Sequence, residues 1–225
     1  MGRCHEIAAP HPWNSVFICG VSPAFDDYSV VPIFTMEEKK LVKPGQSSAQ
    51  ESPWPPGDRL LRLLWEFSWF VFCQWTPKPL NPWRLFWLRL FDAKIDGTPF
   101  VHQRARIAIP WNLTLHDRAC LGDRANAYTL GEIEIGPRAT VAQEVYLSTG
   151  THDFSRAELP LLTAKITIGE DAFLGARAFV MPGVTIGARS VVGACSVVTK
   201  DVPPDVMAAG NPCRVLGPRT PSFPG

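Results

Sequence analysis

The sequence lacks the features that mark several large classes of proteins. Neither charge dominates, since 22 Lys and Arg stand against 21 Asp and Glu, and this balance argues against nucleic acid as a partner. No stretch of about 20 residues is apolar and free of charge, which excludes a polytopic membrane protein. The N-terminus has no basic segment followed by an apolar one, so we expect no secretory signal.

The cysteines lack the spacing of a metal site or a redox motif. None of the six belongs to a CxxC pair, which predicts reduced thiols in a cytoplasmic protein. Bulk disorder is excluded because 46% of the 225 residues are hydrophobic. A chain of this length buries one core, or one core and a small appendage.

Four segments differ in composition. Residues 1–53 are irregular and rich in proline, and residues 218–225 form a tail. Residues 54–94 hold six of the eight tryptophans, and residues 95–217 carry an internal repeat. Met36 opens a short charged run typical of an N-terminus, which gives the hypothesis that translation starts there.

The aromatic-rich segment predicts two helices. The first runs from Asp58, as N-cap, to Trp75, and the second begins with Asn81, as N-cap, and ends at Phe91. Both are too apolar to stand alone, so we expect burial against the neighbouring domain or a subunit. The alternative is peripheral membrane contact through residues 58–91, because Trp and Phe beside a basic stripe suit the headgroup boundary.

An aliphatic residue recurs every six positions in the second half of the chain. The positions form five sets of three, and fourteen of the fifteen are Ile, Leu or Val. Such a period indicates a repeat architecture. The positions are Ile95, Val101, Ile107, Leu115, Leu121, Ala127, Ile135, Val141, Leu147, Ile168, Leu174, Val180, Ile186, Val192 and Val198.

Three hexads make one coil of a triangular solenoid. The aliphatic residue points inward, a small residue sits at the corner, and a Gly directly after the aliphatic residue permits the backbone angles of the corner. Two slips of two residues and a longer insertion all follow a third hexad, so they share one corner. We therefore expect an all-β solenoid of about five coils, capped at its N-terminal end by the aromatic helices.

Motifs over residues 54–217 resemble the hexapeptide-repeat acyltransferases, and among these the exopolysaccharide O-acetyltransferases of the colanic-acid type. The resemblance implies a left-handed parallel β-helix, a homotrimer with active sites between subunits, and acetyl transfer from acetyl-CoA to a sugar or glycan hydroxyl, without a metal. The motifs are WRLFWLRLFDAKI (83–95), PWNL (110–113), STGTHD (148–153), LPLLTAKITIG (159–169), VMPGVTIG (180–187), VVTKDVPP (197–204) and AGNPCRV (209–215).

Acyl transfer to a hydroxyl needs a base, and histidine suits this role near neutral pH. His152 lies at the root of the insertion, and the resemblance identifies it as the general base. The alternative interpretation is that His152 is a polar loop residue whose side chain bonds to the backbone of its own loop. His102 and His116 are expected to face solvent. The related γ-type carbonic anhydrases bind zinc through three histidines, two of them close together in one coil, and no such pair occurs here, so we expect no metal.

The resemblance also implies binding residues. Asp153, Asn126 and Tyr128 would contact the acceptor, although Asp153 equally suits a loop turn. Related enzymes often have Asn at Thr129 and Trp at Phe173, and Phe173 would still form a wall of the pantetheine channel. Lys200 and Arg214 would meet phosphates, or are solvated surface charges. The implied coenzyme A residues are Phe173, Ala176, Ala194, Thr199, Lys200 and Arg214.

A rival function from another class remains open at this point. The chain could be a non-catalytic trimeric β-helix scaffold, or a membrane-surface module that uses residues 58–91. We expect the protein in the cytoplasm. If the two helices bind membrane, it would lie at the inner face of the membrane.

Overall fold

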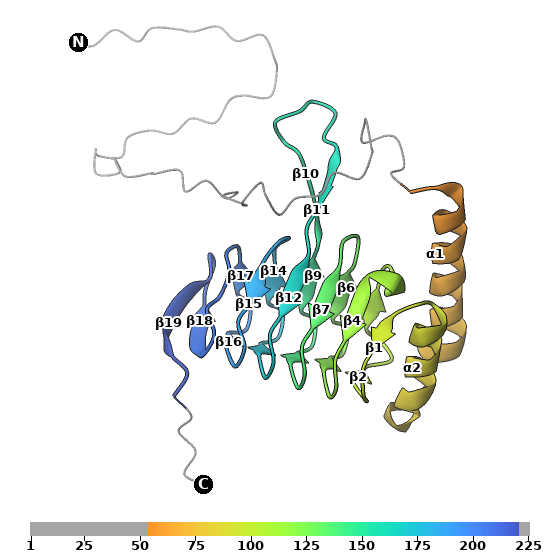
Figure 1. Cartoon of the computed structure of the whole chain (residues 1–225), viewed down its shortest axis with the longest axis horizontal. Helices are drawn as coiled ribbons and strands as arrows, with labels where there is room; N and C mark the ends of the chain where they lie inside the picture. Colours follow the sequence, from red (N-terminus) through yellow and green to blue (C-terminus); the bar gives the residue numbers. More distant parts are fainter. Residues whose placement is uncertain (1–53, 221–225) are drawn as a thin grey trace, which may run out of the picture. The chain divides into compact units, whose positions relative to one another are not determined.

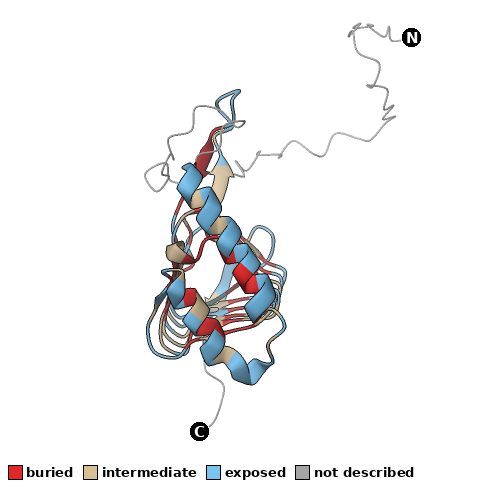
Figure 2. Ribbon diagram, turned by 90° about the vertical axis from the view of Figure 1, so that its right-hand side faces the viewer, coloured by how far each residue is buried: buried red, intermediate tan, exposed pale blue. Residues whose placement is uncertain are grey.

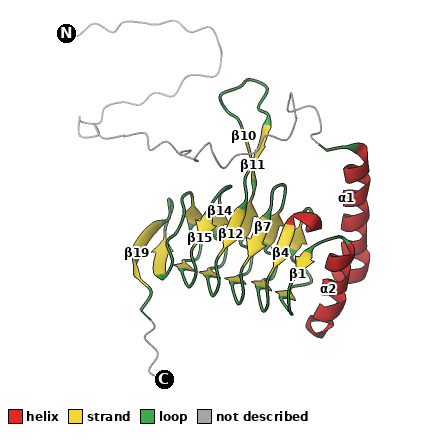
Figure 3. Ribbon diagram, in the orientation of Figure 1, coloured by secondary structure: helices red, strands yellow, loops and turns green. Residues whose placement is uncertain are grey.

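The computed structural model describes residues 54–220 (Figure 1). The expectations for residues 1–53, including a start at Met36, and for the end of the tail from residue 221 lie outside the described residues. The described part begins with helical elements and continues into short strands (Figure 3). The helical elements are α1 (Pro56–Ser68), the π-helix η2 (Trp69–Cys73), the 3₁₀-helix η3 (Lys78–Leu80) and α2 (Asn81–Leu90), and a 3₁₀ turn η4 (Pro110–Asn112) follows in the strand region.

The strands form three parallel sheets, which are the three faces of the solenoid. The first face holds β1 (Lys94–Ile95), β4 (Leu113–Leu115), β7 (Ile133–Ile135), β12 (Ile166–Ile168) and β15 (Thr185–Ile186). The second holds β2 (Phe100–Val101), β5 (Cys120–Leu121), β8 (Thr140–Val141), β13 (Phe173–Leu174), β16 (Val191–Val192) and β18 (Val206–Ala209), to which β19 (Arg214–Pro218) adds antiparallel. The third holds β3 (Arg106–Ile107), β6 (Asn126–Tyr128), β9 (Tyr146–Ser148), β14 (Phe179–Val180) and β17 (Val197–Val198).

The six-residue period builds the core as predicted. Equivalent aliphatic residues pair from coil to coil, and fourteen of the fifteen are buried. Ile95, at the N-terminal end of the stack, is half-buried. Five coils are complete, and a partial sixth follows because Val202 bridges to Ile186 and Ala208 pairs with Val192. The solenoid is thus held by stacking of like residues along its axis.

The reason given above for the corner glycines is wrong. The left-handed backbone conformation falls two residues further on, at residues such as Arg138 (φ 56°) and Asp171 (φ 55°), and these are not glycines. Glycine is needed instead because the next coil passes very close. A Cβ on Gly187 would lie 2.3 Å from Pro204 N, and one on Gly175 would lie 2.6 Å from Ala194 N. Close approach of two backbones therefore selects glycine here.

The predicted helix caps are also wrong. The first helix begins at Pro56, with Pro55 in the cap position, and Asp58 makes no capping bond. Asn81 caps the solenoid instead: its Nδ2 donates to Pro99 O (2.8 Å), and its Oδ1 accepts from Val101 N (3.0 Å). The first coil has no preceding coil to satisfy its backbone groups, so side chains of the helices take that role.

The two helices pack one stripe of side chains against the first coil. Trp65, Trp69, Leu85 and Leu88 are buried there, and Trp65 Nε1 donates to Ile107 O (2.7 Å). Figure 2 shows this buried stripe against wide exposed surfaces on both helices. The expected burial is confirmed for the inner stripe alone. Within residues 54–220, no helix is long and apolar enough to span a bilayer.

Candidate active site

The insertion after the third coil is an antiparallel hairpin that carries His152. Strand β10 (Gly150–His152) pairs with β11 (Leu161–Thr163), and His152 lies opposite Leu161. The hairpin stands out from the edge between the third and first faces (Figure 1). The His152 side chain is exposed at the far end of β10, where a second molecule can approach it.

A backbone carbonyl fixes the orientation of the imidazole. His152 Nδ1 lies 2.7 Å from Leu159 O. A carbonyl oxygen only accepts, so Nδ1 carries the proton, and in the neutral ring Nε2 keeps its lone pair. Leu159 has a φ of 46°, which is uncommon for a bulky residue and marks a backbone held in place by its surroundings. The bond agrees with both expectations for His152, since a base needs this orientation and a loop residue could also make it.

The root of the hairpin is clamped to the coil below it by Thr149. This side chain is fully buried; its hydroxyl donates to Tyr128 O (2.5 Å) and accepts from Gly131 N (2.8 Å). Ala164 N donates to Thr149 O (2.9 Å) on the returning strand. The clamp holds β10, and hence His152, in a defined position on the solenoid.

Asp153 closes the loop that follows β10. Its amide donates to Pro160 O (2.9 Å), and its Oδ1 accepts from Ser155 N (3.1 Å). These are the contacts of the loop turn that the sequence also allowed. Asp153 lies next to His152 in the chain, and its contacts here are those of the turn.

Tyr128 and Asn126 both belong to β6, but their side chains lie near different parts of the structure. The Tyr128 ring lies at the hairpin root, since a Cβ on Gly150 would be 3.6 Å from Tyr128 Cε1. The Tyr128 ring is 6.0 Å from that of Tyr146, which stacks on Phe179 at 5.0 Å. These rings form an aromatic row over part of the third face.

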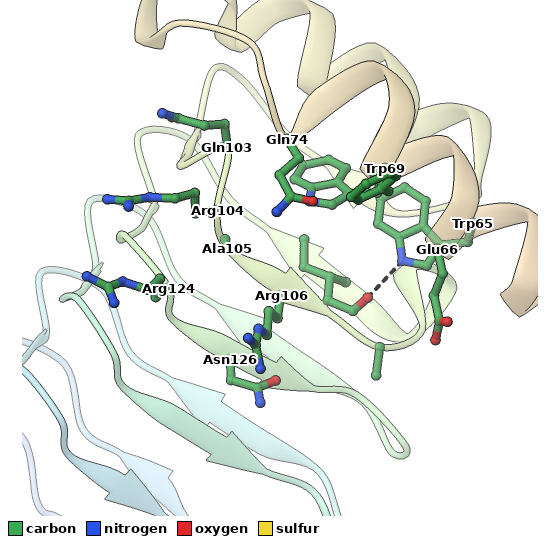
Figure 4. A pocket seen from close by; sticks show the side chains of 13 residues that line it. Trp65, Glu66, Trp69, Gln74, Gln103, Arg104, Ala105, Arg106, Arg124 and Asn126 are labelled. Atoms are coloured by element: carbon green, nitrogen blue, oxygen red, sulfur yellow. Dashed lines mark hydrogen bonds between the residues drawn. The ribbon is translucent and has the colours of Figure 1, made fainter.

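Asn126 lines a pocket of about 390 Å³ between the helices and the first coils. Figure 4 shows Trp65 and Trp69 on one side and the side chains of Arg106 and Asn126 on another. Arg104 and Arg124 add further guanidinium groups, and amide side chains complete a polar lining. The pocket therefore combines aromatic rings with amide, guanidinium and carboxylate groups that can form hydrogen bonds to a ligand.

The expected coenzyme A residues are spread over two edges and one face. Thr199 and Lys200 follow β17, at the same edge as the His152 hairpin. Ala176 and Ala194 lie at the edge between the second and third faces, where Cys195 N donates to Ala176 O (2.9 Å). Arg214 begins β19, and its side chain is exposed.

Phe173 lies on the second face and is 42% exposed, whereas His152 belongs to the opposite edge of the triangle. Phe173 lines a groove of about 630 Å³ that also includes His102 and Asp123. Within one chain, the predicted base and the predicted wall of the pantetheine channel therefore lie on different sides of the solenoid.

The expectation of a solvent-facing side chain is wrong for His102, whereas the His116 side chain stays partly exposed. His102 is buried, with Nδ1 3.1 Å from Asp123 Oδ1, because the helices cover this part of the first coil. Burial lowers the pKa of His102, partly offset by the Asp123 charge. His116 is half-buried, and its Nε2 lies 3.1 Å from Glu134 Oε1. Among residues 54–220, no group of three or more His, Cys, Asp or Glu is placed to hold a metal ion.

Two positioning features were missed from the sequence. Thr149 stands at an ordinary corner position, and only its burial under the insertion shows the clamp. The Leu159 carbonyl carries no residue-type signature, because any residue has one. A polar residue at the start of an insertion is the nearest sequence hint for Thr149.

Comparisons with known proteins identify the class that this fold and site define. A family model described as bacterial transferase hexapeptide (six repeats) matches residues 165–200. A protein of Escherichia coli (strain K12) described as "Putative colanic acid biosynthesis acetyltransferase WcaF" is 43% identical over 159 residues, which cover 71% of this chain and 87% of that protein. Two solved structures are similar as well: a maltose O-acetyltransferase from Clostridium difficile 630 (TM-score 0.62, 28% identity, 74% of this chain and 92% of that chain) and a galactoside acetyltransferase in complex with coenzyme A (TM-score 0.59, 26% identity, 75% and 86%).

The chain belongs to the family of hexapeptide-repeat acetyltransferases. It is an acyltransferase with acetyl-CoA as its co-substrate, and its solenoid is the left-handed parallel β-helix of that family. The resemblance to the colanic-acid type is confirmed by the match to WcaF. A scaffold without catalytic activity, the rival expectation, finds no support among these relatives.

Proposed function

We propose that the protein transfers an acetyl group from acetyl-CoA to a sugar hydroxyl in exopolysaccharide biosynthesis, with His152 as general base. The biosynthetic role is supported by the match to WcaF, and a sugar acceptor by the names of the galactoside and maltose enzymes. In domain terms, residues 95–217 would be the acyltransferase domain and residues 54–94 its helical cap. A cytoplasmic location stays a prediction.

The fixed imidazole is the observation that carries the proposal. With Nδ1 donating to Leu159 O, Nε2 is left as the ring nitrogen that would accept a proton from an incoming hydroxyl. Nε2 takes the hydroxyl proton while the hydroxyl oxygen bonds to the thioester carbonyl carbon. The tetrahedral intermediate then collapses, the carbon–sulfur bond breaks, and the imidazolium returns the proton to the departing thiolate. Direct transfer of this kind needs no acyl-enzyme.

The active site would form between copies in a homotrimer. Phe173 and His152 lie on different sides of the triangle, so a single acetyl-CoA touching both would take them from neighbouring subunits. Small residues at Ala176 and Ala194 admit close approach of the pantetheine arm. The cosubstrate's phosphates would meet residues toward the C-terminal end of the solenoid, namely Thr199, Lys200 and Arg214.

The acceptor would lie along the third face, below the hairpin. Tyr128, whose ring lies at the hairpin root, would lie beside the reacting hydroxyl, and Asp153 would contact the acceptor next to His152. Asn126 and the pocket it lines would receive a more distant part of a glycan. Trp faces, amides and guanidinium groups there match sugar rings and their hydroxyl groups.

A histidine substitution with a matched control tests the proposal. His152→Ala should lower kcat by roughly 10²–10⁴-fold, the usual contribution of a positioned base. His116→Ala, at another histidine outside the site, should leave kcat near the wild-type value. Coenzyme A release is measured over a panel of monosaccharides and nucleotide sugars, with thermal unfolding to show that both variants fold. Wild-type kcat in His152→Ala would remove His152 from the mechanism.

A further inference from the structure

The outward surface of the two helices is apolar, although nothing in the described chain covers it. Among residues 54–220, nineteen large hydrophobic side chains are exposed, and thirteen of them lie between Leu60 and Leu90. We call this surface the cap platform; it includes Leu63, Phe67, Trp75, Trp83 and Phe86. Soluble monomers rarely expose a contiguous apolar patch of this kind unless it binds something.

The cap platform faces away from the solenoid. Both helices turn a different stripe, with Trp65 and Leu88 among its residues, toward the first coil. Figures 1 and 2 show the helices lying across the end of the stacked coils, with the exposed faces directed outward. Copies packed side by side along their triangular faces would leave this end uncovered, so the proposed trimer does not account for it.

Charge favours one occupant over another. Residues 54–94 carry six Lys and Arg, of which Arg84 is buried, and three Asp and Glu, while the rest of the sequence carries sixteen and eighteen. The net positive charge of the chain therefore resides in the cap, where Arg59, Lys78 and Arg89 are exposed. Two cap platforms facing one another would bring like charges together, whereas an anionic surface attracts them.

We propose that the cap platform binds the surface of an anionic lipid bilayer, with α1, η2 and α2 lying in the plane of the interface. Phe and Leu side chains would enter the acyl boundary, while Trp75 and Trp83 would sit at headgroup level beside the basic side chains. Within residues 54–220 no helix is long and apolar enough to cross the bilayer, so these helices would lie on it. This inference goes beyond the proposed function and does not depend on His152.

Vesicle flotation of the full chain tests the proposal. Vesicles of phosphatidylglycerol and phosphatidylcholine should carry the protein to the top of the gradient, and pure phosphatidylcholine should carry much less. The double variant Leu63→Ser, Phe67→Ser should lower the partition coefficient by about tenfold or more, because it removes two of the most exposed apolar side chains. The matched control Val215→Ser, Leu216→Ser alters exposed apolar residues at the other end of the solenoid and should float like the wild type.

Several outcomes would overturn the proposal. The wild type could stay in the dense fraction at every lipid concentration, or the Leu63, Phe67 variant could float as well as the wild type. Light scattering could instead show a wild-type particle twice the mass of the variant's, which would make the platform an interface between copies. Acetyl transfer to a soluble acceptor, measured in parallel, should persist in the Leu63, Phe67 variant. Flotation without any acetyl transfer in the wild type would refute the proposed function alone.

Discussion

Replacing Thr149 by Val would remove the clamp under the His152 hairpin without changing the shape of the side chain. Thr149 is fully buried, and its hydroxyl bridges Tyr128 O and Gly131 N. Valine fills the same space, so no cavity forms and the lost hydrogen bonds are isolated from other effects. Thr149→Ser keeps the hydroxyl and loses a methyl group, which makes it the matched control.

The size of the effect follows from the groups left without partners. Gly131 N loses its acceptor, whereas Tyr128 O keeps the longer bond from Thr149 N (3.3 Å). One orphaned, partly buried group costs about 1–3 kcal/mol, so we expect a destabilisation of about 1–3 kcal/mol. Loosening of β10 would also misplace His152, and a displacement of this kind can lower kcat by up to about 100-fold.

Urea unfolding and steady-state kinetics together check the prediction. Thr149→Val should lose both stability and kcat, and Thr149→Ser should keep most of both. Equal damage in the two variants would show that the methyl group matters rather than the hydroxyl. Wild-type kcat in a destabilised Thr149→Val protein would show that the clamp does not position the base.

Three further predictions concern the cap, the cosubstrate path and pH. Arg84 is fully buried and donates to Val101 O (2.8 Å) and to two other backbone carbonyls. Arg84→Met should therefore lower the free energy of unfolding by about 3–5 kcal/mol, measured by thermal unfolding. The matched control Arg89→Met, at an exposed residue, should lower it by less than about 0.5 kcal/mol. Cys195 is exposed next to Ala194, and saturating coenzyme A should slow its alkylation by iodoacetamide; an unchanged rate would contradict the proposed path. The hydrogen bond from Lys165 lowers the pKa of Glu134, so stability is gained above the ordinary carboxyl pKa and lost as pH falls toward the lowered one. Glu134→Gln should flatten this part of the acid unfolding profile, and an unchanged profile would contradict the assignment.

The repeat made much of the fold predictable from sequence alone. Each coil stacks on its neighbours through equivalent positions, so one local pattern, read fifteen times, predicts the faces, the corners and the buried residues. The hairpin after Leu147 was placed at the correct edge for the same reason. His152 as the base and the coenzyme A residues came from the resemblance, and their roles stay predictions.

Tertiary structure decided what no local pattern could express. Asn81 and Asp58 look like helix caps in the sequence. In the structure the Asn81 side chain instead forms hydrogen bonds with the backbone of the first coil, and Asp58 makes no capping bond. Glycine after the aliphatic residue is explained only by the backbone of the next coil, 2.3 Å from an added Cβ at Gly187. The carbonyl that orients His152 belongs to a residue seven positions away, and the separation of His152 from Phe173 follows from closure of the triangle. Contacts that repeat in every coil leave a period in the sequence, whereas contacts made once, between distant parts of the chain, leave none.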